Sequence, residues 1–125
     1  MALTTLKKRS EFLRVRGGRR WSSHAFVLEA RSRPEDAGTS REARFGFTVS
    51  KKIGSAVVRN RVRRRLRSLA AALDPSQLRQ GYDYVLIARP GAAERAFCDL
   101  KADLDLALTR VHQSPSTKDR NGRPQ

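Results

Sequence analysis

The chain has 125 residues, with 27 Lys and Arg residues against 12 Asp and Glu residues, and therefore a formal net charge of +15. This length suits one compact domain, and the excess of positive charge indicates an anionic partner such as nucleic acid. No stretch approaches the ~20 apolar residues of a membrane span, and the start MALTTLKKRSEFL lacks the apolar run of a signal peptide, so we expect a cytoplasmic protein without membrane contacts.

A short helix and a first strand are expected near the N-terminus. The helix contains Phe12 and is expected to end at Gly17, with Ser10 or a threonine ahead of it as the cap. Residues 25–31, AFVLEAR, alternate between two faces, which predicts a strand in a half-exposed sheet.

A polar loop over residues 32–42 separates this strand from residues 44–50, RFGFTVS, where Phe45 and Phe47 share one face of a second strand. An antiparallel hairpin is the simplest connection between the two strands. A further short strand around residues 21–24, or within the polar loop, is also compatible with the pattern.

Residues 51–67, KKIGSAVVRNRVRRRLR, carry eight Lys and Arg residues and no acidic residue. Gly54 and Ser55 let the chain turn into a helix, which is expected to end near Asp74 because the residue before Pro75 disfavours helical torsion angles. Apolar residues recur at spacings of three and four and predict a side that docks onto a core: Val58, Val62, Leu66, Leu69 and Leu73.

The opposite side of this helix is predicted to be a cationic face formed by Asn60, Arg61, Arg63, Arg64 and Arg67. Arg59 and Arg65 fall at the borders of the apolar stripe, where their stems could pack on the core. Neighbouring like charges repel by a few tenths of a kcal/mol per pair, so an anionic polymer outside the protein is expected to compensate them. A merely solvated helix would mix Glu with Lys, which this one does not.

The second half of the chain is predicted to be largely structural. Up to Arg67 there are 19 basic and five acidic residues, whereas the remainder has eight basic and seven acidic residues. Residues 82–88, YDYVLIA, are almost all apolar, which predicts a central strand. Residues 97–111 place Leu100, Leu104 and Leu108 on one side of a packing helix. We therefore expect one small α+β domain over residues 1–112 and a disordered polar tail over 113–125.

Cysteine and histidine are too sparse for a disulfide framework or a metal site. Cys98 is the only cysteine, and neither a CxxC nor a His-Glu metal spacing occurs. We expect Cys98 to be a small packing residue at a helix border, and His112 to act as a cation that complements the carbonyl end of the last helix. The sequence predicts no catalytic residue and no metal ligand in the protein itself.

Residues 50–67, SKKIGSAVVRNRVRRRLR, resemble the signature of the bacterial ribonuclease P protein subunit, with its Arg-Asn-Arg core at Arg59, Asn60 and Arg61. The resemblance extends to Phe12 in an early helix, to the FVL strand, to the GFTVSKK approach and to YDYVLIAR, and it covers about residues 6–111. It implies an αβββαβα domain in which the basic helix makes an unusual left-handed crossover between parallel strands.

The resemblance also implies a function. A catalytic RNA cleaves precursor tRNA at the 5′ end of the mature sequence with magnesium ions, and one protein per RNA assists, so the protein alone needs no cofactor. Contacts to the backbone of the catalytic RNA are implied for Lys51, Lys52, Arg59, Asn60, Arg61, Arg63, Arg64 and Arg67. For Asn60, a helix cap or a local backbone bond is an equally good interpretation.

A second implied surface is a cleft between the first helix and the sheet, which holds the single-stranded 5′ leader of precursor tRNA. Phe12 matches the family's aromatic residue there, although by pattern alone a core role is the better interpretation. One turn later the family often has a second aromatic residue, where this chain has Arg16, and after FVL some members have an aromatic residue where this chain has Glu29. These departures favour phosphate contact through Arg16 over base stacking.

Two other classes fit parts of the pattern. A ribosomal or other structural RNA-binding protein would also pair a basic helix with a small sheet, but it would need no site for a leader. A helix-turn-helix DNA-binding protein fits less well, because strands and not a second helix flank the basic helix.

Overall fold

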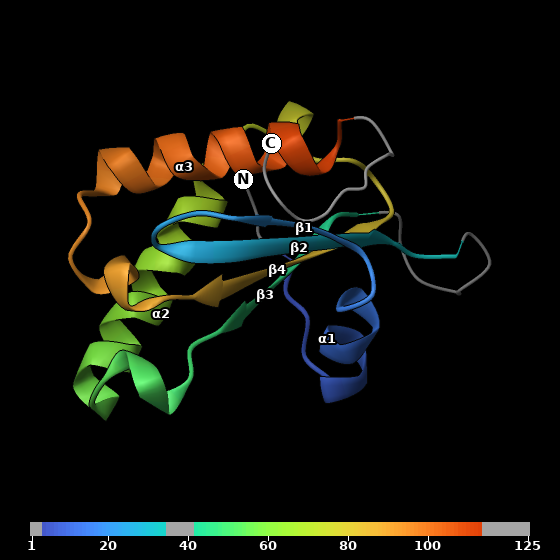
Figure 1. The fold of residues 1–125 in the computed structure, drawn as a ribbon. Helices are drawn as coiled ribbons and strands as arrows, with labels where there is room; N and C mark the ends of the chain where they lie inside the picture. The colour runs from blue at the N-terminus through green and yellow to red at the C-terminus, as the bar shows by residue number, and fades with distance from the viewer. Residues whose placement is uncertain (1–3, 35–41, 114–125) are drawn as a thin grey trace.

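The computed structural model describes residues 4–34 and 42–113 (Figure 1). The helices are α1 (Arg9–Val15), α2 (Ala56–Ala71) and α3 (Phe97–Val111), and the strands are β1 (Arg19–Ser22), β2 (Phe26–Ser32), β3 (Arg44–Thr48) and β4 (Tyr82–Ala88). Three short 3-10 segments are η1 (Lys51–Ile53), η2 (Pro75–Gln77) and η3 (Pro90–Ala93). The predicted α+β class and the αβββαβα order are confirmed. The predicted disordered tail, apart from its first residue, lies outside the described residues.

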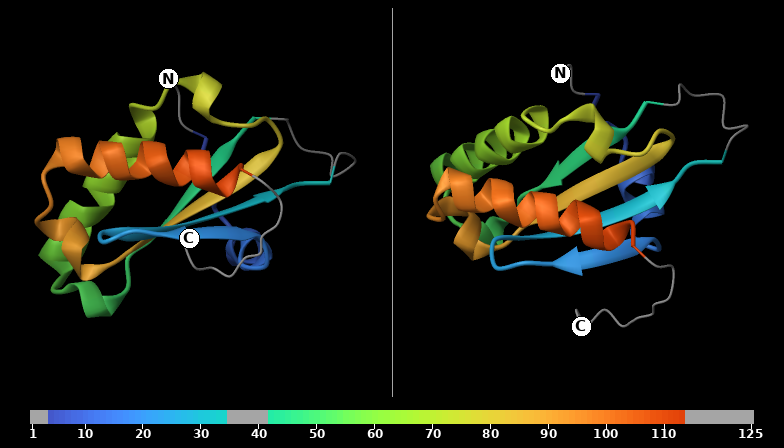
Figure 2. Two further views of the ribbon diagram at one scale, coloured as in Figure 1. Left: turned by 45° about the horizontal axis from the view of Figure 1, so that its top comes forward. Right: turned by 90° about the horizontal axis from the view of Figure 1, so that it is seen from above.

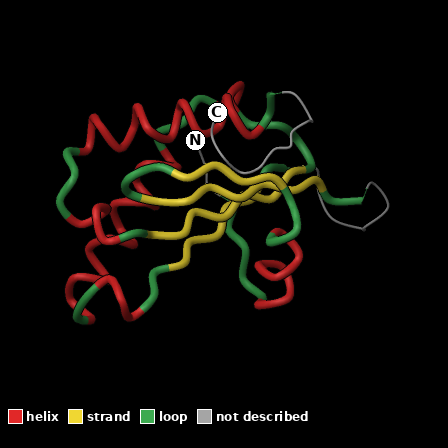
Figure 3. Tube along the Cα trace, in the orientation of Figure 1, coloured by secondary structure: helices red, strands yellow, loops and turns green. Residues whose placement is uncertain are grey.

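The strands are ordered β1-β2-β4-β3, so β4 lies inside the sheet, as its apolarity predicted. β2 pairs antiparallel with both β1 and β4, whereas β3 pairs parallel with β4. The predicted hairpin between the strands now seen as β2 and β3 is wrong, because β4 lies between them. A parallel pair needs a crossover connection, and α2 supplies it between β3 and β4 (Figure 3). The hand of this crossover stays a prediction.

The three helices divide between the two faces of the sheet. α2 and α3 cover one face and α1 lies on the other (Figures 1 and 2). The larger core lies on the side of α2 and α3 and includes Phe26 and Tyr84, while a smaller core on the side of α1 includes Val15 and Val85. Residues 26–30 of β2 are buried on both faces, so the expectation of a half-exposed sheet is wrong for this strand.

α1 begins without the predicted cap. Ser10 lies inside the helix, and the carboxylate of Glu11 instead accepts hydrogen bonds from the backbone N–H groups of Lys7 and Lys8, at 2.8 and 2.9 Å. After the helix, a Cβ atom at Gly18 would lie 2.2 Å from a backbone carbonyl oxygen of β2. Glycine therefore allows the chain to pass this close to the sheet.

α2 begins where predicted but ends at Ala71, three residues before Asp74, which instead caps the start of η2. The hydroxyl oxygen of Ser55 accepts a hydrogen bond from the backbone N–H of Val58 at 3.3 Å. In the predicted apolar stripe, Val62 and Leu66 are fully buried, while Val58 near the helix start is half-buried. The stripe therefore fixes which side of α2 faces away from the protein.

α3 packs through the predicted apolar side, where Leu100, Leu104 and Leu108 are buried. Its first turn lies before the first buried position, and Phe97 is 42% exposed there. Cys98 is also exposed, so its predicted role as a packing residue is wrong.

A buried carboxylate joins α1 to the sheet. Asp83 on β4 is completely buried. Its two oxygens accept hydrogen bonds from Arg44 at 2.9 and 3.0 Å, from Arg14 of α1 at 2.9 Å, and from Arg33 at 2.6 Å. Arg44 also donates to Glu11 of α1 at 3.2 Å. Charge-assisted hydrogen bonds from three guanidinium groups offset the cost of burying this charge.

Replacing Asp83 by alanine is expected to destabilise the fold by ~3 to 5 kcal/mol, because the change leaves buried guanidinium groups without their counter-charge. The free energy of unfolding in urea measures the effect. Asp105→Ala is the matched control, because Asp105 is half-exposed on α3, where it pairs with Lys101 at 3.0 Å and accepts a hydrogen bond from Gln77 at 2.8 Å. Loss of these two exposed or half-exposed contacts should cost about 1 kcal/mol. Equal losses in the two variants would contradict a central role for Asp83.

Acid is expected to weaken the same network. Burial alone would raise the pKa of Asp83, but the hydrogen bonds from Arg44, Arg14 and Arg33 outweigh it and lower the pKa. The stabilisation is therefore complete above the usual pKa of ~4 and is lost as the pH falls through the lowered value. The free energy of unfolding, measured in urea, should fall between pH 7 and pH 3. It should fall less over this range in Asp83→Asn. An identical pH dependence in both proteins would refute the assignment.

Candidate nucleic-acid interface

The side of α2 that faces away from the core carries the predicted cationic residues. Together with two lysines on η1 they form a surface that we call the basic face: Lys51, Lys52, Arg59, Asn60, Arg61, Arg63, Arg64 and Arg67. α2 contains no acidic residue, and none of its arginines lies in its last turn, where the helix dipole would favour positive charge. Neither acidic neighbours within the helix nor its dipole therefore neutralise this charge.

Some arginines of α2 form hydrogen bonds within the protein. Arg59 donates a hydrogen bond to the carbonyl oxygen of Gly54 at 2.9 Å. Arg65 donates to the carbonyl oxygen of Ala93 at 3.0 Å and to that of Arg95. These contacts agree with the structural role predicted for both residues at the borders of the stripe.

The other members of the basic face are more accessible. Arg61 is exposed but donates one hydrogen bond to Ala93 at 3.2 Å, and the guanidinium carbon of Arg67 lies 5.7 Å from the centre of a phenylalanine ring. Asn60 lies inside the helix and accepts a hydrogen bond from Arg63 at 3.1 Å, so it is not the cap. Arg64 is exposed and forms no hydrogen bond or ion pair within the described residues.

The residues predicted for the leader lie where α1 meets the sheet, on the face opposite α2 and α3. We call this place the helix–sheet border and define it by Phe12, Arg16, Arg20 and Glu29. Phe12 is half-buried against the smaller core, and its ring lies so close to Gly46 that a Cβ atom there would meet it at 2.4 Å. Arg16 caps the end of α1 and is exposed. The structure thus gives Phe12 the packing role that its pattern favoured.

Glu29 is a second buried carboxylate, 3% exposed, on the same face of the sheet. Burial raises its pKa, while Arg20 and Arg16 partly counteract that rise. Arg20, on β1, lies directly opposite Glu29 and donates a hydrogen bond to it at 3.2 Å. Arg20 is not among the residues predicted from the sequence, because its pairing with Glu29 depends on the register between β1 and β2. The alternation within residues 19–22 is the only signal that could have indicated it.

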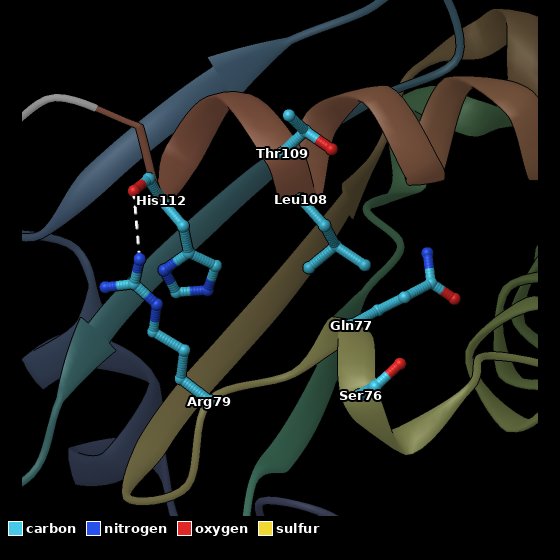
Figure 4. A pocket seen from close by; sticks show the side chains of 6 residues that line it. All are labelled: Ser76, Gln77, Arg79, Leu108, Thr109 and His112. Carbon is cyan, nitrogen blue, oxygen red and sulfur yellow. Dashed lines mark hydrogen bonds between the residues drawn. The ribbon is translucent and has the colours of Figure 1, made fainter.

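A pocket lies elsewhere, between η2 and the last turn of α3 (Figure 4). Arg79 lines it and donates a hydrogen bond to the carbonyl oxygen of His112 at 3.1 Å. The His112 ring is hydrogen-bonded to the hydroxyl of Tyr84 at 2.7 Å. Burial lowers the pKa of His112 to about 4. His112 is therefore neutral at pH 7, and its predicted role as a cation is wrong. Arg19 and Arg79 supply positive charge to these carbonyl groups instead.

Across the described ranges 4–34 and 42–113, no three His, Cys, Asp or Glu side chains gather as they would around a metal ion. In the same ranges no helix is long and apolar enough to cross a bilayer. The features that stand out are the basic face and the helix–sheet border, which lie on different sides of the sheet.

Comparison with known proteins identifies the family. The family model for ribonuclease P matches residues 2–112. The ribonuclease P protein component of Ruegeria pomeroyi is 46% identical over 111 residues, which cover 88% of this chain and 87% of that protein. The chain belongs to the ribonuclease P protein family. The ribonuclease P protein component of Paramagnetospirillum magneticum is also 46% identical, over 113 residues that cover 87% of this chain and 83% of that protein.

Solved ribonuclease P proteins have the same fold. That of Staphylococcus aureus superposes with a TM-score of 0.71 at 25% identity and covers 89% of this chain and 97% of its own. That of Thermotoga maritima gives a TM-score of 0.69 at 25% identity and covers 85% of this chain and 96% of its own. Membership confirms the family resemblance seen in the sequence, and it is consistent with a role in tRNA processing as part of an endoribonuclease.

Arg65→Ala is expected to lower the free energy of unfolding by ~1 to 2 kcal/mol, because the carbonyl groups of Ala93 and Arg95 lose their donor. Arg64→Ala is the matched control and should change stability by less than ~0.5 kcal/mol, since Arg64 is exposed. Urea unfolding of both variants measures the difference. A loss for Arg64→Ala as large as that for Arg65→Ala would contradict this division of the helix.

Proposed function

We propose that this chain is the protein subunit that binds the catalytic RNA of ribonuclease P and the 5′ leader of precursor tRNA, and that it promotes removal of the leader to give the mature 5′ end. The observation that carries this proposal is the basic face, whose positive charge no acidic residue of α2 neutralises. The location that fits this function is the cytoplasm, with one protein on each RNA.

The basic face suits the backbone of a folded RNA. Each guanidinium is planar and can donate two parallel hydrogen bonds to phosphate oxygens, while Lys51 and Lys52 act as point charges. The apolar stripe of α2 is docked on the core, so the helix presents its arginines from a fixed support. Clustered phosphates neutralised in this way release condensed counterions, and folded RNA then holds magnesium at a lower bulk concentration.

The leader fits the helix–sheet border. This place lies on the opposite face of the sheet from α2 and α3 (Figure 2), so one protein can contact two RNA segments at once. Arg16 and Arg20 provide positive charge there, and Phe12 holds α1 against the sheet. Tethering a substrate strand beside the catalytic RNA raises its effective concentration at the cleavage site.

The chemistry is assigned to the RNA and its magnesium ions. The buried carboxylates Asp83 and Glu29 are held by arginines, and His112 is bonded to Tyr84 on the other face. In this division the protein residues bind and orient the two RNAs, and the magnesium ions that the RNA binds supply the polarisation that phosphodiester cleavage needs.

Cleavage of precursor tRNA tests the proposal. The purified protein, ribonuclease P RNA transcribed from the same source and a precursor tRNA are mixed at low magnesium, and 5′ cleavage is measured with each component omitted in turn. We expect cleavage at the mature 5′ end that requires both the RNA and the protein. An RNA that is active alone at high magnesium but gains nothing from the protein would instead indicate a structural RNA-binding protein of the ribosomal type.

Arg61→Ala and Arg64→Ala are expected to lower affinity for the catalytic RNA and to raise the magnesium concentration needed for half-maximal cleavage, because each removes phosphate contacts. Arg110→Ala is the matched control, since Arg110 is an exposed arginine on α3 whose guanidinium lies over Trp21 and donates to Gln113, away from the basic face. The measurement is a magnesium titration of the cleavage rate with each variant. A magnesium requirement that stays at the wild-type value in both α2 variants would refute this use of the basic face.

A further inference from the structure

The arginines around the helix–sheet border fall into two groups. Arg14, Arg33 and Arg44 are held by Asp83, at distances of 2.6 to 3.0 Å. Arg16 and Arg20 are exposed; Arg20 donates a hydrogen bond to Glu29 at 3.2 Å, and the side chain of Arg16 forms no hydrogen bond or ion pair within the described residues. Arg31 is also exposed but belongs with the first group in holding α1, because it donates a hydrogen bond to the carbonyl oxygen of Arg14 at 2.9 Å. The side chains of Arg16 and Arg20 are held neither by Asp83 nor by a backbone carbonyl group of the described residues, so they are available to a partner outside the protein.

Glu29 holds Arg20 in place without saturating it. Its side chain is 4% exposed, whereas that of Arg20 is 56% exposed, and one N–H group of Arg20 joins them at 3.2 Å. A guanidinium has five N–H donors, so Arg20 keeps donors without a partner among the described residues. Arg16, at the end of α1, adds a second positive charge, which partly counteracts the raised pKa of Glu29. Two arginines and one carboxylate leave a net positive charge at the border.

Aromatic surface is scarce at the same place. Among the described residues, Phe12 is the aromatic residue that packs against the smaller core. Its ring covers Gly46. Trp21 lies next to Arg20 but packs with the larger core on the other face, as Phe47 and Tyr82 do. Bases of a single strand bind proteins mainly by stacking on aromatic rings, and the border offers little such surface.

We propose that the helix–sheet border binds the sugar-phosphate backbone of single-stranded RNA, with Arg16 and Arg20 contacting phosphates, Glu29 as the positioning residue for Arg20, and the bases left outside. This rests on the proposed function, in which the 5′ leader lies at this border. Binding of this kind depends little on leader sequence and strongly on salt. Arg16 and Arg20 are then the leader contacts of this chain, and Phe12 is a packing residue.

Chemically altered leaders test the proposal. The complex of catalytic RNA and protein is titrated with precursor tRNA and with the same tRNA lacking its leader, and the ratio of the two affinities gives the leader contribution. Two further substrates carry a leader without bases, or a leader with uncharged methylphosphonate linkages. We expect the leader without bases to keep the leader contribution within ~2-fold, and the uncharged leader to lose most of it, because each lost charge-assisted contact costs at least ~5-fold.

Variants of the two arginines locate the contact. Arg16→Ala and Arg20→Ala should each lower the leader contribution by ~5-fold or more and make its salt dependence shallower by ~0.7 in a double-logarithmic plot. Arg20→Lys should restore part of the loss, because the charge remains. Arg110→Ala is the control for the loss of one positive charge elsewhere, and affinity for the catalytic RNA without tRNA reports whether each variant is folded.

The outcomes separate the two proposals. A wild-type complex that binds substrates with and without a leader equally well overturns both the leader site and its phosphate contacts. A clear leader contribution that vanishes when the bases are removed overturns only the phosphate contacts. The same conclusion follows if Arg16→Ala and Arg20→Ala keep the wild-type leader contribution while they bind the catalytic RNA normally.

Discussion

The position of α1 depends on the buried carboxylate of Asp83. α1 has seven residues, too few for a helix that is stable by itself, so its orientation comes from tertiary contacts. Arg14 joins the helix to Asp83, and Glu11 joins it to Arg44 on β3, so two ion pairs fix the helix against two strands. The distance between Arg16 and the sheet follows from these contacts. The helix–sheet border is therefore a consequence of charge pairing as much as of the small apolar core beneath α1.

The same side chain, arginine, has three different environments in this protein. Around Asp83 it neutralises a buried carboxylate. On α2, Arg65 donates to two backbone carbonyl groups and supports the segment before α3. The side chains of Arg64 and Arg16 have neither kind of partner within the described residues. Composition reports only the sum of these environments, whereas the partners of each guanidinium decide which arginines remain for RNA.

Much of the molecule could be predicted because its signals are local. The apolar stripe of α2 and the capping residue Ser55 are patterns within one helix, and the position of the basic face follows from them. The pairing of β3 with β4 could not be predicted, because it joins segments separated by a whole helix. The Asp83 network and the Arg20–Glu29 pair depend on that long-range topology and on strand register. Charged residues scattered along the chain looked independent in the sequence, and the sheet brings them together.

The positive charge of the basic face lowers the stability of the free protein and favours binding of a polyanion, and both effects have the same origin. Repulsion among neighbouring guanidinium groups raises the free energy of the folded protein, and salt relieves it by screening. Salt has the opposite effect on RNA binding, because it reduces the gain from counterion release. Bound RNA also stabilises the folded state by mass action. The free energy of a helix with this charge is thus lower in a complex with a polyanion than in the free protein. This is expected of a surface suited to a polyanion, and not of a surface that stabilises its own fold.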